Sequence, residues 1–185
     1  MKTLFTADLH IKLGQKNVPI DWSINRFNLF IDQLSDMQNK ADTLVLGGDI
    51  FDRVPTTAEL ELYFRLISSI TIPCVIYPGN HEALKKNTTF LTHLKEVTTS
   101  INSKAVIIDK CCTMYGLDFI PYNHLKDKEW PEPTSKVLCT HVRGEIPPHV
   151  KPEIDLTKLD GWDIVLAGDL HSHTNSQRNI VYPGS

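Results

Sequence analysis

LVLGGDIFDR, residues 44–53, is the stretch that decides the predicted fold. A short run of leucine and valine ends in two glycines, and the carboxylate of Asp49 follows at once. A buried parallel strand delivers a ligand to the carboxyl edge of a sheet in this way. Taken alone, the stretch fits an ordinary strand and polar turn equally well. It gains weight because the same arrangement recurs elsewhere in the chain.

The size, charge and cysteine content limit the class of protein. The chain has 185 residues and a formal net charge of −3, which fits one domain that buries a core without disulfides. The cysteines form neither a C-x-x-C pair nor a disulfide framework, so we expect a reducing, cytoplasmic location. No apolar run is long enough to cross a bilayer, and we expect no signal peptide. The acidic balance argues against a broad basic surface, but bound cations would still admit a phosphate substrate.

Strand and helix patterns alternate along the first half of the chain. Strands are expected at residues 3–6, 43–46 and 73–78. A helix is expected from Trp22 onward, with Asp21 as its N-cap and an apolar stripe of Ile24, Phe27, Ile31 and Leu34. A second helix is expected over 57–70, and this alternation indicates parallel βαβ units. Further elements are expected as a helix at 89–97 and strands at 105–108, 113–115, 117–120, 137–140, 163–167 and 179–182.

Ligand-type side chains follow five of the expected strands. Because open α/β sheets place their ligands at the carboxyl ends of the strands, these side chains should lie together. They are Asp8 with His10, Asp49, Asn80 with His81, His141, and Asp169 with His171 and His173. Carboxylates mixed with imidazoles suit divalent manganese, iron or zinc, and the ligands are too numerous for one ion. We therefore expect two ions that share Asp49, an arrangement that suits hydrolysis of phosphate esters.

The same residues resemble the sequence blocks of the calcineurin-like metallophosphoesterases, nearly end to end. The blocks are, in order, Asp8-x-His10, Gly48-Asp49-x-x-Asp52, Gly79-Asn80-His81-Glu82, His141 and Gly168-Asp169-x-His171. The resemblance implies an α/β fold of the αββα sandwich type, with mixed β-sheets flanked by helices. Residues 48–52 and 182–185 look most like the SbcD-type nuclease subunit of DNA repair and recombination, including its phage relatives. We expect residues 1–185 to be a single catalytic core, without the cap and ATPase-binding regions of that family.

The resemblance also implies a role for each ligand. Asp8, His10 and Asp49 would bind the first metal, with Asp49 bridging, and Asn80 and His141 would bind the second.

Three further polar residues have implied roles near the reacting phosphate. His81 would protonate the leaving oxygen or stabilise the charge that builds on phosphorus, and the Asp52 carboxylate would orient His81 through a hydrogen bond. Alternatively, Asp52 caps the helix that follows it. Arg53 either contacts a substrate phosphate or is simply solvated.

One block departs from the family pattern. Where the family usually has Gly-His-x-His, this chain has Gly168-Asp169-x-His171. An ungapped match makes Asp169 a ligand of the second metal and His171 a ligand of the first, whereas a shift of two residues would use His171 and His173. We favour the ungapped match because the glycine that ends the strand fixes where the next side chain enters. The extra carboxylate favours manganese, with iron, zinc and magnesium as alternatives.

The predicted activity is that of a metal-dependent DNA phosphodiesterase, an exonuclease or endonuclease subunit. The resemblance implies a partner ATPase, SMC-like and of SbcC type. A phosphomonoesterase of the serine/threonine-phosphatase or nucleotide-phosphatase type is the alternative, although Ile11 stands where those phosphatases carry glycine. A third hypothesis is a non-enzymatic module that docks an ATPase. The oligomeric state stays open, with a homodimer as one alternative.

The other histidines and the aromatic residues of the predicted helices are not expected to belong to the site. His93, His124 and His149 match no block and are expected at the surface or partly buried. The aromatic residues at helical spacing are expected in the core and not on a base-stacking surface; they are Phe27, Phe30, Tyr63 and Phe64.

Overall fold

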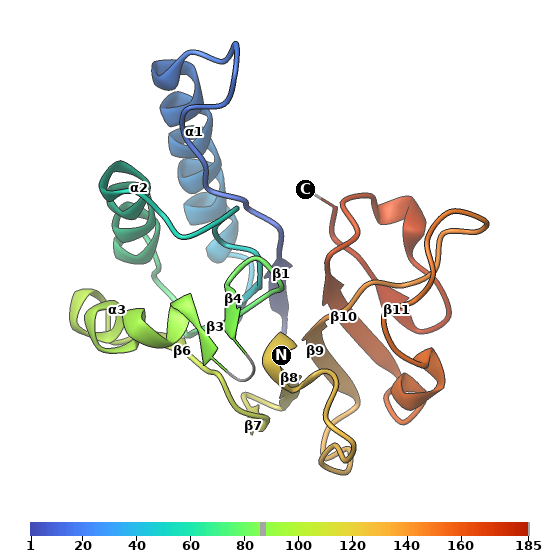
Figure 1. Cartoon of the computed structure of the whole chain (residues 1–185). Coiled ribbons are helices and arrows are strands. Elements are labelled where there is room, and N and C mark those ends of the chain that lie inside the picture. The colour runs from blue at the N-terminus through green and yellow to red at the C-terminus, as the bar shows by residue number, and fades with distance from the viewer. Residues whose placement is uncertain (86–87, 185) are drawn as a thin grey trace.

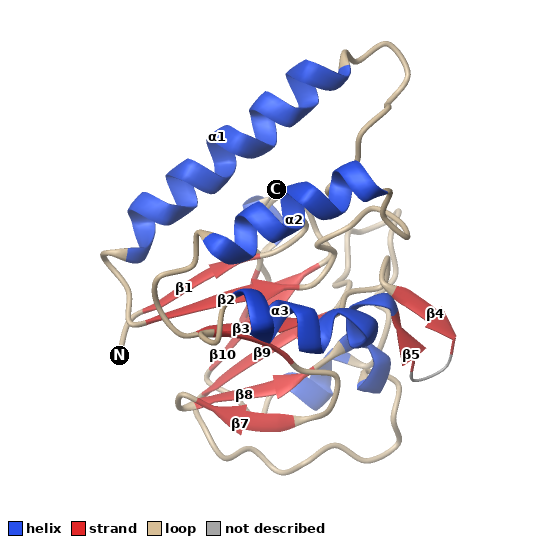
Figure 2. Ribbon diagram, turned by 90° about the vertical axis from the view of Figure 1, so that its left-hand side faces the viewer, coloured by secondary structure: helices blue, strands red, loops and turns tan. Residues whose placement is uncertain are grey.

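Two β-sheets stack face to face in the computed structural model, which describes residues 1–85 and 88–184 (Figure 1). The first sheet is entirely parallel, in the order β1-β2-β3-β6. Its strands are β1 (Thr3–Thr6), β2 (Thr43–Gly47), β3 (Cys74–Tyr77) and β6 (Ala105–Ile107). Three helices lie against its outer face (Figure 2): α1 (Ile20–Gln38), α2 (Thr57–Ser68) and α3 (Lys95–Ile101). The predicted βαβ units are therefore confirmed.

The second sheet is mixed, in the order β11-β10-β9-β8-β7, and β7 pairs antiparallel with β8. Its strands are β7 (Cys112–Met114), β8 (Leu117–Ile120), β9 (Val137–His141), β10 (Ile164–Gly168) and β11 (Ile180–Val181). Its outer side packs against the 3-10 helix η3 (Leu156–Leu159) and Trp162. The predicted sandwich is confirmed, but within the described residues short 3-10 helices take the place of the fourth, α-helical layer.

The strands of the first sheet are buried on both faces, which explains the unbroken leucine and valine run of β2. Side chains alternate across a strand, so Leu44 and Leu46 pack toward the helices while Val45 packs toward the second sheet. On β9, Leu138 faces outward and Cys139 faces the first sheet. The sandwich thus has three apolar layers, and the middle one fixes how the two sheets face each other.

Several local predictions about helix ends are wrong. Helix α1 begins at Ile20 after Pro19, and Asp21 lies in its first turn without acting as the N-cap. Helix α2 is capped by Thr56 in a capping box with Glu59, so Asp52 does not cap it.

Two predictions for the segment after β3 also need correction. The helix expected over 89–97 is a 3-10 helix, η1 (Phe90–Leu94), followed by α3. The strands β4 (Ala83–Lys85) and β5 (Thr88–Thr89) form a small antiparallel pair that was not predicted.

The predicted burial of the helix aromatics and the predicted exposure of the remaining histidines are confirmed. Phe27 and Tyr63 are buried, and Phe30 and Phe64 are partly buried against the same core. The imidazoles of His93 and His149 are exposed, and His124 is partly buried, with Nδ1 2.7 Å from the Asp127 carboxylate. Among residues 1–85 and 88–184, no helix has the length and apolar character that a bilayer span requires.

A buried carboxylate on β8 ties the second sheet to the loop that precedes β9. Asp118 is 6% exposed and accepts hydrogen bonds from Thr134 N (2.8 Å), Ser135 N (2.9 Å), Trp162 Nε1 (2.8 Å) and Thr113 Oγ1 (2.7 Å). Burial alone raises the pKa of Asp118, but the Thr134 hydroxyl, the Trp162 N–H and the other donors outweigh it and hold the pKa well below its usual range. The ionised carboxylate therefore stabilises the fold.

Replacing Asp118 tests this network. We expect Asp118→Asn to lower the free energy of unfolding by about 2 to 3 kcal/mol at neutral pH, because an amide turns one acceptor into a donor that faces other donors. A group with a depressed pKa stabilises above its unfolded value and loses that effect as the pH falls through its folded value. The difference from wild type in urea denaturation should therefore shrink as the pH drops below 3.8, the ordinary aspartate value. Asp163→Asn, at an exposed carboxylate, is the control and should change stability by less than about 0.5 kcal/mol; an equal effect of both variants would contradict the prediction.

Candidate metal centre

The segments that follow β1 and β2 run side by side and carry the first ligands. Asp8 N donates to the Gly48 carbonyl (3.0 Å), and His10 N donates to the Asp49 carbonyl (2.9 Å). Asp8, His10 and Asp49 have φ angles of 59°, 45° and 51°, in the left-handed region that non-glycine residues rarely adopt. Such conformations persist where the surroundings over-determine them, commonly at functional sites. Here the backbone geometry gathers the side chains of two strands.

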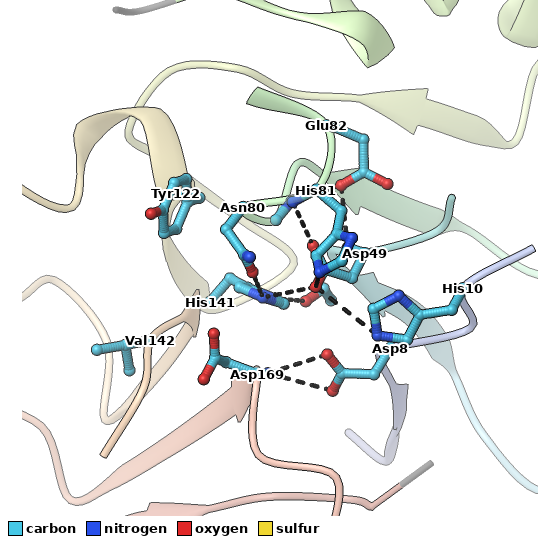
Figure 3. A network of polar contacts seen from close by, with 12 residues as sticks. Asp8, His10, Asp49, Asn80, His81, Glu82, Tyr122, His141, Val142 and Asp169 are labelled. Carbon is cyan, nitrogen blue, oxygen red and sulfur yellow. Dashed lines mark hydrogen bonds and ion pairs between the residues drawn. The ribbon is translucent and has the colours of Figure 1, made fainter. Parts of the chain in front are cut away.

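Asp49 lies at the centre of the cluster (Figure 3). Its side chain is 2% exposed, and Oδ1 accepts a hydrogen bond from His81 N at 2.9 Å. Oδ2 lies 3.4 Å from His141 Nε2 and 3.8 Å from Nε2 of both His10 and His81. Burial alone raises the pKa of Asp49, but the His141 imidazole and the His81 N–H outweigh it and lower the pKa. Asp49 is therefore an ionised, buried acceptor among three imidazoles.

His141 enters this cluster from the other sheet. It ends β9 and is fully buried; Nδ1 donates to the Gly47 carbonyl (2.9 Å), and Nε2 lies 3.0 Å from Asn80 Oδ1. A Cβ at Gly48 would stand 2.6 Å from His141 Nδ1, and one at Gly168 would stand 2.5 Å from it. Gly48, directly after β2, and Gly168, at the end of β10, thus make room for the imidazole between the sheets.

The two histidines that follow β10, His171 and His173, occupy different positions in the structure. His171 Nε2 lies 3.0 Å from His10 Nε2 and 3.8 Å from Asp8 Oδ1. His173 Nδ1 instead donates to the Tyr182 carbonyl at 2.7 Å. The structure therefore brings His171 to the cluster and leaves His173 beside it.

Asp169 joins the cluster through both its backbone and its side chain. Its N–H donates to the Asp8 carboxylate (3.0 and 3.2 Å), with φ at 103°. Figure 3 shows its carboxylate on the side of the site where Asn80 and His141 lie. Burial raises the pKa of Asp169, and the neighbouring His141 opposes this only in part.

The predicted roles of Asp52 and Arg53 need correction. His81 Nδ1 donates to the backbone carbonyl of Asp52 (2.7 Å), whereas the Asp52 carboxylate is paired with Lys12 Nζ (2.6 Å). Asp52 thus orients His81 through its main chain, which a sequence motif does not reveal. Arg53 is not simply solvated, because its guanidinium binds the buried Glu59 carboxylate at 2.9 and 3.0 Å.

Glu82 belongs to one of the family blocks, but the sequence reasoning assigned it no role. Its buried carboxylate accepts hydrogen bonds from Asp49 N (3.0 Å), Phe51 N (2.8 Å) and Gly79 N (2.8 Å). Burial, with the charge of Asp49, raises the pKa of Glu82 to about 7. Glu82 therefore holds together the two loops that carry Asp49 and His81. Its position directly after His81 was the one available signal, and it does not distinguish a buried carboxylate from a solvated one.

The donor set fits divalent cations. The potential ligands form three groups, and within each group the ligand atoms lie within 4.8 Å of one another. Asp49 belongs to two of these groups. The groups are Asp8-His10-His171, His10-Asp49-His81 and Asp8-Asp49-His141. Burial alone lowers the pKa of His141, but Asp49 outweighs it and raises the pKa to about 10. The cluster therefore attracts positive charge strongly, and mixed carboxylate and imidazole ligands suit first-row transition metals.

Comparison with known proteins agrees with this geometry. The family model for calcineurin-like phosphoesterases matches residues 1–175. The chain belongs to this family. Membership confirms the resemblance drawn from the sequence blocks and assigns the chain to the metal-dependent phosphoesterases, which typically use two divalent metals.

Individual relatives point the same way. The chain is 45% identical over 193 residues to "Probable exonuclease subunit 1" of Escherichia phage T5, covering 100% of this chain and 59% of that protein. It thus spans less than two thirds of the relative's length. The crystal structure of TT1561 of Thermus thermophilus matches with a TM-score of 0.58 and 14% identity, over 98% of this chain and 88% of that one. This likeness supports the fold.

Replacing Glu82 tests its role in holding the loops. Glu82→Gln keeps the shape of the side chain but leaves one acceptor oxygen for three N–H donors. We therefore expect the free energy of unfolding to fall by about 1 to 3 kcal/mol. Urea denaturation measures the change, and hydrogen exchange at the amides of residues 49, 51 and 79 should accelerate. Glu61→Gln, on the exposed face of α2, is the matched control. Unchanged exchange at those amides would contradict the assignment.

Proposed function

We propose that the protein is a two-metal-dependent phosphodiesterase that cleaves DNA as a nuclease subunit. The observation that carries the proposal is the position of Asp49 between the sheets, where its buried carboxylate lies 3.4 Å from the His141 imidazole and 3.8 Å from those of His10 and His81. The relative named an exonuclease subunit supports a phosphodiester substrate over a phosphomonoester.

We assign the ligands as the resemblance to the family implies, and the proximity of Asp8, His10 and His171 and of Asp49 and His141 supports this division. Asp8, His10, Asp49 and His171 would hold one ion, and Asp49, Asn80, His141 and Asp169 would hold the other. When bound, such ions supply positive charge to a phosphoryl group and lower the pKa of water, and manganese suits the carboxylate-rich set. Asp169 replaces the imidazole that the family usually carries there, and its raised pKa would fall beside a cation.

His81 is suited to protonate the leaving oxygen. Nδ1 donates to the Asp52 carbonyl, so Nε2 is free to carry the proton that is transferred. Burial alone lowers the pKa of His81, but the Asp52 carbonyl and the Asp49 carboxylate outweigh it and raise the pKa above the usual histidine value. The side chain is 36% exposed, so a substrate can reach it.

The cellular setting is proposed from the same relative and from the cysteines. A protein named a subunit implies a partner, and we propose an SMC-like ATPase of SbcC type in DNA recombination or repair. The four cysteines are free, in keeping with a reducing cytoplasm.

A comparison of substrates tests the proposal. With Mn²⁺, we expect hydrolysis of bis-p-nitrophenyl phosphate and linear DNA to exceed hydrolysis of p-nitrophenyl phosphate. Asp49→Asn should bind less Mn²⁺ in isothermal titration. Its loss of activity should exceed about 10- to 100-fold, which is the loss expected when a residue outside the ligand sphere is replaced. Asp36→Asn, at an exposed aspartate of α1, should behave as wild type. Turnover of the monoester alone would overturn the nuclease function, and unchanged metal binding by Asp49→Asn would overturn the two-metal site.

Replacing His81 separates a proton donor from a ligand. We expect His81→Gln to lower kcat on DNA by about 100- to 10,000-fold while the Mn²⁺ stoichiometry in titration stays that of wild type. His93→Gln, at an exposed histidine, serves as the control. Loss of one bound ion in His81→Gln would make His81 a ligand instead, since it also lies in a potential ligand group with His10 and Asp49.

A further inference from the structure

A cavity of about 730 Å³ opens beside the metal centre. It lies between α1 and the segment that follows β10, and Pro183 and Gly184 at the end of the described chain also line it. Its lining includes Asp8, His10 and His171, which together form one of the potential ligand groups. A molecule in this cavity would therefore stand directly beside the proposed reacting phosphate.

The cavity wall combines aromatic surface with a single arginine. Phe27 and Phe30 of α1 line it, and Phe30 is only partly buried. Arg26 also lines it, with Cζ 4.8 Å from the ring centroid of Phe27. Among the described lining residues Asp8 is the one carboxylate, and we assign that carboxylate to a metal. In a chain of net charge −3, this wall is unusually free of negative charge.

We propose that the cavity is the subsite for the nucleotide next to the scissile phosphate, with Arg26 on the following backbone phosphate and Phe30 against the base or sugar. The volume lies within the range of about 300 to 1,000 Å³ that small-ligand sites occupy. Arginine pairs well with phosphate oxygens, and aromatic side chains accept any base through stacking. The inference rests on the proposed nuclease function and adds the residues that distinguish a nucleic-acid strand from a small diester.

Two substrates separate binding in this subsite from chemistry at the metals. We expect Phe30→Leu to raise KM for a short oligonucleotide by about 5- to 100-fold, the range that one stacked base provides. Arg26→Ala should also raise this KM, because the contact with the backbone phosphate is lost. Both should change kcat/KM for bis-p-nitrophenyl phosphate far less, because this diester has no second phosphate for Arg26 and neither base nor sugar for Phe30. Arg65→Ala is the matched control, because Arg65 is exposed on α2 and pairs with Asp32. Thermal unfolding midpoints check that Phe30→Leu is folded.

Binding without metal provides a readout that does not depend on turnover. In EDTA, fluorescence anisotropy of a labelled oligonucleotide should show weaker binding to Arg26→Ala, and the slope of log K against log salt should fall by about 1. Wild-type affinity, salt slope and KM in Arg26→Ala would overturn the subsite. A wild-type protein that binds the oligonucleotide through Arg26 but hydrolyses no diester would support the subsite and overturn the proposed function, so the two failures are distinguishable.

Discussion

The hydrogen bond from His141 to the Gly47 carbonyl joins the two sheets where the site forms. A fully buried imidazole must be hydrogen-bonded, and here one ring nitrogen is satisfied by the end of β2 while the other faces Asp49 and Asn80. The close approach leaves no room for a side chain at Gly48 or Gly168. Gly48, the second glycine in the stretch that decides the fold, is therefore required by the imidazole from the opposite sheet, whereas a Cβ at Gly47 would meet the Phe5 ring.

This arrangement concentrates buried carboxylates at one point. Asp8, Asp49 and Glu82 are each no more than 3% exposed, and burial favours their neutral forms. His141 and the His81 N–H outweigh this effect for Asp49 and lower its pKa, whereas the pKa values of Asp8 and Glu82 remain raised. Bound cations would complete the charge balance, since they would favour the ionised forms of all three carboxylates. The electrostatics of the site thus give a physical reason for metal binding that is independent of family membership.

The sequence was informative where a residue type and its strand position were enough. Asp8, His10 and Asp49 follow strands and His141 ends one, and parallel strands bring their carboxyl ends together, so the gathering of these side chains was predictable. The role of Asp52 was not, because it acts through its carbonyl and its carboxylate pairs with Lys12. Glu82 was missed because the N–H groups that it accepts from include residues about thirty positions away. Contacts that depend on backbone orientation or on distant loops leave no periodic pattern in a sequence.

The division of ligands between the sheets makes the inter-sheet core part of the site. The first sheet supplies Asp8, Asp49 and Asn80, and the second supplies His141 and Asp169, so a small slide of one sheet would change every distance between these two sets. The apolar layer between the sheets resists such a slide because close-packed interiors transmit strain. Tyr77 adds a directional restraint, since its buried hydroxyl donates to the Thr140 carbonyl at 2.9 Å, next to His141. Residues far from any phosphate in this layer therefore help to set the geometry at which two cations can be held.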